Sequence, residues 1–238
     1  MPLYPVPENL LLRAAARARL PHLARKLKHL TFEAGQELRP SGGHGAPAIF
    51  PVRGLISLQV SVSRGKRVEI GMVGREGFAG ICLLLGTDRA EMTAVALTDG
   101  EAVIMPQQVF KGYLVNPAFR AAAERYAQLF IAVVAHGLVC NRVHVIENLC
   151  TGRLLQMQDR TQIDTFHLTQ DSLSRHLGVR RASINRAVAH LQNEGAIRYD
   201  RRGKLMIVDR RRLERLACTC YRAVKAEFDR LVEMQGGL

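Results

Sequence analysis

HLTQDSLSRHLGVRRASINRAVAHLQNEGAIRYDRRGKLMIV, residues 167–208, contains two helical patterns separated by a glycine. Thr169 can cap the first helix, and Gly178 permits the tight turn before the second, which we expect over residues 180–194. Apolar residues at a spacing of three and four give each helix one apolar side. The stretch therefore predicts a helix-turn-helix, although a helical hairpin with a solvated charged face has the same pattern.

The second helix of the pair has an outer side of small and hydrogen-bonding residues. A helix that enters the major groove needs an apolar back and a slim front with donors and acceptors for base edges. Arginine pairs with guanine, asparagine pairs with adenine, and serine bonds to a base or a phosphate. The expected base-contacting residues are Arg181, Ser183, Asn185 and Arg186.

The segment after this helix predicts a β-hairpin with a basic tip. Residues 196–199 and 205–208 are of strand type, and Gly203 permits the turn between them. Cations on such a loop give affinity for the phosphate backbone without selecting a sequence. The expected backbone-contacting residues of the hairpin and the helix pair are Thr169, Gln170, Arg180, Arg201, Arg202 and Lys204. Residues 209–233 then predict a single closing helix.

The charge of the chain is concentrated in this region. The formal net charge is +13, from 34 Lys and Arg against 21 Asp and Glu, and residues 175–215 hold twelve of these basic residues but four acidic ones. Such a local excess favours an anionic partner, either nucleic acid or an acidic membrane surface. The apolar run at 129–135 is far shorter than the roughly 18 residues of a membrane span, and arginines break the N-terminal apolar run. We therefore expect a cytoplasmic protein that binds double-stranded DNA and no membrane.

The first half of the chain has a β-type texture. Short apolar runs between residues 31 and 105 alternate with glycines at intervals of about ten residues, which predicts an antiparallel sandwich or barrel. Residues 8–30, before it, carry two short helical patterns. A long helix follows Asn116 and Pro117, and its apolar stripe can pack on its own domain or on a second copy. We favour dimerisation over an ordinary core helix, through Tyr126, Leu129, Val133, Cys140 and Val143.

The chain resembles the Crp/Fnr family, the bacterial group that contains the cyclic-AMP receptor protein and the fumarate–nitrate regulator. The resemblance is carried by LTQDSL (168–173), LGVRRASI (177–184), LQNEGAI (191–197) and RRGKLMIVD (201–209). It implies an α+β fold in three parts: an N-terminal antiparallel β-roll (1–116), a long dimerisation helix (117–147) and a C-terminal winged helix-turn-helix (148–238). It also implies a homodimeric transcriptional regulator that binds a palindromic operator and contacts RNA polymerase.

The family's β-roll holds cyclic nucleotide with a short cassette, which is altered here. A Gly-Glu pair binds the ribose, and an arginine followed by Ser or Thr and Ala binds the phosphate. Gly80 and Thr93 keep their places, but Ile81 replaces the acid and Met92 replaces the arginine. Arg89 could substitute only if its turn folded inward. Because a phosphate in a cleft needs a countercharge, we expect no cyclic nucleotide, with a cyclic-nucleotide-responsive regulator as the alternative.

Other chemistries have weak signals in this sequence. The iron–sulfur members of the family use closely spaced N-terminal cysteines, but the first cysteine here is Cys82, so we expect neither a cluster nor another cofactor. Cys218 and Cys220 fall within the expected closing helix, where their side chains would diverge, so we interpret them as packing residues rather than metal ligands.

Two rival classes of function have weaker support. An enzyme is not indicated, because no lysine-bearing phosphate loop, zinc-hydrolase motif or nucleophile elbow is present. A basic RNA-binding or scaffold protein is the second alternative, but only Tyr199 near the hairpin could stack on single-stranded bases.

Overall fold

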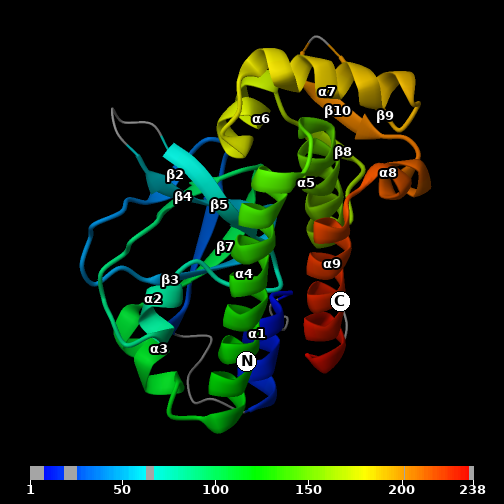
Figure 1. Cartoon of the computed structure of the whole chain (residues 1–238). Helices are drawn as coiled ribbons and strands as arrows, with labels where there is room; N and C mark the ends of the chain where they lie inside the picture. The colour runs from blue at the N-terminus through cyan, green and yellow to red at the C-terminus, as the bar shows by residue number, and fades with distance from the viewer. Residues whose placement is uncertain (1–7, 19–25, 63–66, 201, 236–238) are drawn as a thin grey trace.

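The computed structural model describes residues 8–18, 26–62, 67–200 and 202–235. A β-roll lies on one side of a long helix, α4 (Pro117–Val143), and the C-terminal helices and strands lie across the far end of that helix (Figure 1). The last helix, α9 (Thr219–Met234), runs back along α4. The expected order of a β-roll, a long helix and a helix-turn-helix is confirmed.

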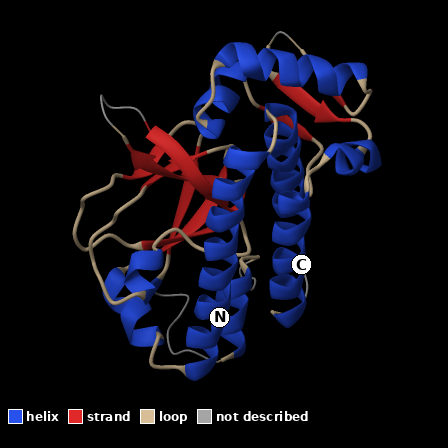
Figure 2. Cartoon of the chain, in the orientation of Figure 1, coloured by secondary structure: helices blue, strands red, loops and turns tan. Residues whose placement is uncertain are grey.

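The β-roll consists of two antiparallel sheets (Figure 2). One has the order β1–β7–β3 and the other the order β2–β6–β4–β5. The strands are β1 (Lys28–Phe32), β2 (Glu37–Arg39), β3 (Ala48–Arg53), β4 (Ile56–Ser61), β5 (Arg67–Val73), β6 (Thr93–Ala96) and β7 (Gly100–Met105). A short helix, α2 (Ile81–Leu84), lies between β5 and β6, and α3 (Gln107–Tyr113) connects β7 to α4. The aromatic rings of Phe50, Phe78 and Phe110 pack together in its core.

The N-terminal helical patterns are only partly confirmed. Helix α1 (Leu10–Arg17) is capped by Asn9, whose side chain accepts hydrogen bonds from the backbone amides of Leu11 and Leu12. Residues 19–25 lie outside the described residues. The second helical pattern is wrong from Lys28 onward, because β1 pairs with β7 there and the ladder outweighs local propensity.

Helix α4 begins with Asn116 as its cap and Pro117 in its first turn. Its inner side packs so closely on the roll that a Cβ on Gly77 would overlap the ring of Tyr126. By length and composition alone α4 could cross a membrane, contrary to the expectation from the short apolar run. Core helices of soluble proteins meet the same test, and the inner side of α4 belongs to the core of this protein.

The stripe assigned to dimerisation divides between two environments. Tyr126, Leu129 and Val133 are buried in the protomer's own core, so these three residues are not available to a second copy. Cys140 is half-buried and contacts Cys218 just before α9, whereas Val143 is exposed. The expectation that this whole stripe forms the dimer contact is therefore corrected. The physical reason is that the β-roll packs on most of the stripe.

The C-terminal part contains a three-stranded sheet in the order β8–β10–β9 beneath a pair of helices (Figure 2). Its elements are α5 (Ile146–Thr161), β8 (Thr165–His167), α6 (Gln170–Leu177), α7 (Arg181–Asn193), β9 (Ile197–Tyr199), β10 (Lys204–Ile207) and α8 (Arg210–Leu216). The expected single closing helix is wrong, because extended backbone at Ala217 and Cys218 separates α8 from α9. Phe228 and Leu231 of α9 are buried in the core that also contains the roll and α4.

Candidate nucleic-acid interface

The helix pair α6 and α7 has the geometry expected of a helix-turn-helix. Thr169 Oγ1 accepts a hydrogen bond of 3.1 Å from the backbone amide of Ser172 and so caps α6. Gly178 ends α6 in the left-handed conformation, at φ +67°. Leu173 of α6 and Ile184 of α7 are fully buried in one core, which fixes the two helices against each other.

Helix α7 turns its polar side to solvent at the edge of the molecule (Figure 1). Arg181, Asn185 and Arg186 are exposed, and Ser183 is half-buried. Within the described part of the chain, neither arginine takes part in an ion pair, so both guanidinium groups are available to an external partner. The exposed Ala189, one turn further on, keeps this side slim.

The wing, β9–β10 with its turn, is tied to the start of α6. The Asp200 carboxylate accepts hydrogen bonds of 2.9 Å from the backbone amides of Arg202 and Lys204. Both hydrogen bonds, that from Lys204 more than that from Arg202, lower the pKa of Asp200. The carboxylate that holds the turn is therefore favoured in its charged form. The Gly203 carbonyl accepts a hydrogen bond of 2.7 Å from the Leu168 amide, and Gly203 has φ +85°. The wing tip is therefore held beside the α6 cap.

The basic side chains around this surface fall into two groups. Arg202 and Lys204 at the wing tip and Arg180 before α7 are exposed, as is Thr169 at the α6 cap, while Gln170 is half-buried. Arg201 lies outside the described residues. Other arginines are engaged within the chain: Arg175 pairs with Asp171, Arg210 pairs with Asp159 and Glu214, and Arg212 donates to the Glu194 carbonyl. Only part of the basic excess thus faces solvent freely.

A buried ionic cluster joins this part of the chain to the β-roll. Glu69 of β5 pairs with Arg153 of α5, accepts a 2.6 Å hydrogen bond from Ser57 Oγ, and lies 3.1 Å from His176 Nδ1 of α6. Burial alone would raise the pKa of Glu69, but Arg153, His176 and Ser57 together hold it below its ordinary value. A second pair, Arg160 Nε to a Glu76 carboxylate oxygen at 2.8 Å, is almost fully buried.

Two family models match the chain in the same order as these structural parts. The cyclic nucleotide-binding domain matches residues 29–116, and the Crp-like helix-turn-helix domain matches residues 150–216. The two matches together cover well over half of the chain. The chain belongs to the Crp/Fnr family. This Crp/Fnr protein is accordingly a transcriptional regulator with a DNA-binding helix-turn-helix.

Solved Crp/Fnr structures share the fold of this protein. A transcriptional regulator of the family from Thermus thermophilus is 22% identical, with 80% of this chain and 98% of that chain covered and a TM-score of 0.65. FixK2 from Bradyrhizobium japonicum is 13% identical (81% and 98%, TM-score 0.66). CLP from Xanthomonas campestris, described as a c-di-GMP responsive global regulator, is 12% identical (81% and 98%, TM-score 0.65). Such identities show the fold alone, and no curated protein matches the sequence.

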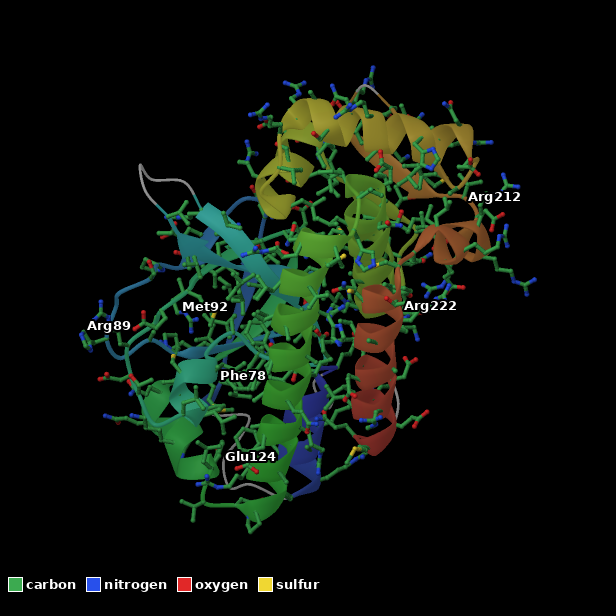
Figure 3. The ribbon with its side chains drawn as sticks, viewed as in Figure 1. Phe78, Arg89, Met92, Glu124, Arg212 and Arg222 are labelled. Atoms are coloured by element: carbon green, nitrogen blue, oxygen red, sulfur yellow. The ribbon has the colours of Figure 1, made fainter. Side chains whose placement is uncertain are left out.

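The effector cassette of this Crp/Fnr protein contains no cation at the expected phosphate position. Met92 is half-buried and packs on the core of the roll, and Ile81 begins α2. Arg89 points outward from the edge of the roll, where it lies 3.6 Å from Glu91 (Figure 3). Thr93 is fully buried, and its hydroxyl has no hydrogen-bond partner among the described residues.

Sequence reasoning missed a charged residue beside this cassette. Arg39 of β2 is 4% exposed, and its guanidinium lies against Gly80, 3.4 Å from the position of an added Cβ. Nη1 donates a long hydrogen bond of 3.5 Å to the Pro47 carbonyl, and Nε has no partner within the described chain. Burial lowers the pKa of Arg39. The cassette pattern could not reveal this residue, because it lies about forty residues upstream and reaches the site through strand pairing.

Proposed function

We propose that this Crp/Fnr protein acts in the cytoplasm as a homodimer on an imperfect palindrome in duplex DNA, together with RNA polymerase. The exposed side of α7 supports this most directly: Arg181, Asn185 and Arg186 are exposed there, their side chains are of the types that bond to base edges, and the two arginines have no ion pair among the described residues. The wing beside α6 supplies Arg202 and Lys204 to the phosphates. Two such units related by a twofold axis would enter successive major grooves about 34 Å apart.

The exposed side of α4 supports the homodimer. Ile131 and Leu138 are 67% and 63% exposed, and Ala135 between them is exposed as well. Their spacing of four and three residues is the heptad spacing of a helix pair. This exposed stripe lies beside the buried one, so a second α4 could cover it without displacing the roll. Large apolar side chains in a row on a solvent-facing helix indicate an interaction surface.

We further propose that the β-roll does not bind cyclic nucleotide in the manner of the family. A cyclic phosphate next to Met92 would lack the arginine that the family has at that position, and a ribose next to Ile81 would lack the carboxylate. An unpaired charge in a partly buried cleft is strongly unfavourable. Arg89, the remaining candidate in the cassette, is exposed and paired with Glu91.

Arg39 favours a second candidate function, response to an anionic effector bound in a different way. A buried guanidinium with one long hydrogen bond to the described part of the chain is poorly compensated and would gain from an anion. Titration calorimetry with cyclic AMP and with c-di-GMP, to which the Xanthomonas CLP regulator responds, tests this candidate. Binding that is lost in Arg39→Gln would support it, and heats equal to those of buffer injections would exclude it for these nucleotides.

Selection of bound fragments from random duplex DNA by the purified full-length protein tests the main proposal. We expect an enriched, imperfectly palindromic site without any added effector. Competitor RNA of the same length is the control, since a general polyanion binder would release the DNA to RNA as readily as to competitor DNA. Enrichment of no sequence, with cyclic AMP and c-di-GMP tried as effectors, would contradict the proposal.

A further inference from the structure

Four possible metal ligands converge where the end of α4, the α4–α5 turn and the start of α9 meet. They are Cys140, His144, Cys218 and Cys220, here named the Cys/His cluster, and their ligand atoms all lie within 4.8 Å of one another. Cys140 Sγ is 3.6 Å from Cys218 Sγ, and Cys220 Sγ is 3.7 Å from His144 Nδ1. We propose that the Cys/His cluster binds one thiophilic divalent cation, and that Zn²⁺ is the ion it suits best.

The spacing of the ligand atoms corresponds to one tetrahedral ion. Zn–S bonds of about 2.3 Å and Zn–N bonds of about 2.0 Å separate tetrahedral ligand atoms by roughly 3.5–3.8 Å. The two contacts given above have that length, and the other pairs of ligand atoms lie within 4.8 Å. The four protein ligands of an iron–sulfur cluster are divided among two or four irons, so as a set they lie farther apart. Three thiolates and one imidazole form a known zinc donor set, whereas Mg²⁺ and Ca²⁺ prefer oxygen.

The helix ends explain how the four side chains come together. Cys140 lies in the last turn of α4, and His144, the C-cap, follows four residues later on the same side. Cys218 precedes α9 with extended backbone (φ −79°, ψ 172°), and Cys220 lies in the first turn of that helix. Because Cys218 is not helical, its thiol can face the same point as that of Cys220. The expectation that the two thiols diverge is therefore wrong.

The surroundings of the Cys/His cluster suit a bound cation. Cys218 and Cys220 are buried, while Cys140 and His144 are half-buried. A cavity of about 130 Å³ lined by the three cysteines gives an ion access from solvent. A divalent cation would provide the positive charge that three thiolates placed so close together require.

The metal content of the purified full-length chain tests this proposal independently of DNA binding. We expect about one equivalent of Zn²⁺ per chain after dialysis in metal-free buffer. After removal of that ion with a chelator, Co²⁺ should bind with the intense visible absorption of a tetrahedral thiolate complex. Cys220→Ala and Cys140→Ala should weaken Co²⁺ binding more than about 100-fold, since even loss of an outer-shell contact costs roughly 10–100-fold.

Cys82→Ala is the matched control, because it removes a buried thiol from the β-roll, outside the cluster, and should leave metal binding unchanged. If the alanine variants do not fold, the Co²⁺ spectrum of the wild-type chain still decides the question. Wild-type protein that takes up no Zn²⁺ and gives no thiolate absorption with Co²⁺ would overturn the proposal. So would a Cys140–Cys218 disulfide in freshly purified, metal-free protein that also fails to bind Zn²⁺ after reduction.

Discussion

Arg186 and Arg202 both present exposed guanidinium groups, but on elements with different access to DNA. Arg186 lies on the outer side of α7, where base edges would be reached, whereas Arg202 lies at the wing tip, where phosphates would be reached. We expect Arg186→Ala to cost about 1–3 kcal/mol on the selected site and to relax the preference at one base pair. Arg202→Ala should weaken binding to all DNA sequences about equally. It should also reduce the slope of log K against log salt concentration by about 1.

Binding of both variants to the selected duplex and to single-base variants of it, at several salt concentrations, measures these effects. Each arginine variant is the control for the other, since the two remove the same charge. An unchanged base preference in Arg186→Ala would show that α7 does not contact bases as proposed.

Glu69 is the residue on which the buried contact between the β-roll and α6 depends. The substitution Glu69→Gln leaves Arg153, which is 8% exposed, without a countercharge. Breaking a buried pair in this way costs about 3–5 kcal/mol. We expect that loss in the free energy of unfolding measured with urea. Glu37→Gln, which removes the carboxylate of an exposed ion pair with Arg67, is the control and should cost less than about 1 kcal/mol.

The pH dependence of this contact follows from the direction of the Glu69 shift. The pKa of Glu69 lies below its ordinary value of 4.5, so the folded state favours the ionised carboxylate. Its stabilising contribution is complete above about pH 4.5 and is lost as the pH falls through the lowered pKa. Wild-type protein should therefore lose more stability than Glu69→Gln in that acidic range. Urea titrations at about pH 6 and about pH 3 measure this loss of stability for each protein. An equal loss in wild type and in Glu69→Gln would contradict this role of Glu69.

At the scale of elements, the exposed stripe of α4 carries the proposed dimer. Leu138→Asp would place two like charges near the twofold axis and remove two buried leucines, each worth about 1.5–3 kcal/mol. We expect a dimer weaker by at least about 100-fold, which light scattering coupled to size-exclusion chromatography measures. Leu85→Asp is the control, because Leu85 is 74% exposed at the end of α2 and is not part of the exposed stripe of α4. A dimeric Leu138→Asp variant would place the interface elsewhere.

The elements that the sequence predicts correctly are those with local signals. Thr169 caps α6, and Gly178 and Gly203 adopt the positive φ that their turns require. The outer positions of α7 then follow from the helical register. In α4 the pattern predicts a broad apolar stripe but cannot tell which part the roll covers, so Tyr126 and Leu138 are indistinguishable until the roll is in place.

Features that depend on tertiary contacts could not be predicted in the same way. Strand β1 is stabilised by pairing with a strand about seventy residues later, and local propensity contains no such information. The break between α8 and α9 was missed because apolar periodicity continues through Ala217. That break also concealed the Cys/His cluster, whose Cys140 and Cys218 are 78 positions apart. A Cys-x-x-x-His sequence at 140–144 and a Cys-x-Cys sequence at 218–220 were the available signals.

At the scale of the whole molecule, two hydrophobic cores meet across the contact between the roll and the C-terminal part. Leu55, Met72 and Leu97 of the roll belong to the same core as the helix-turn-helix, whereas Phe228 of α9 belongs to the core of the roll and α4. After the roll, the chain makes two further crossings between the cores: it enters the second core at the α4–α5 turn and returns to the first early in α9, between Tyr221 and Val224. The Cys/His cluster lies where these two crossings meet.

An ion in the Cys/His cluster would therefore stabilise the folded molecule as a whole. It would bind the folded chain, whose ligands converge, far more tightly than the unfolded chain, whose ligands are separated. At a free Zn²⁺ concentration about 100 times the dissociation constant, this difference stabilises the fold by about 2.7 kcal/mol. For a chain of this length we expect a melting temperature roughly 5–10 °C higher than after chelation. Thermal unfolding followed by circular dichroism measures the shift, which should vanish in Cys220→Ala and persist in Cys82→Ala. Equal melting temperatures of the wild-type protein with and without Zn²⁺ would mean that packing alone holds the two crossings together.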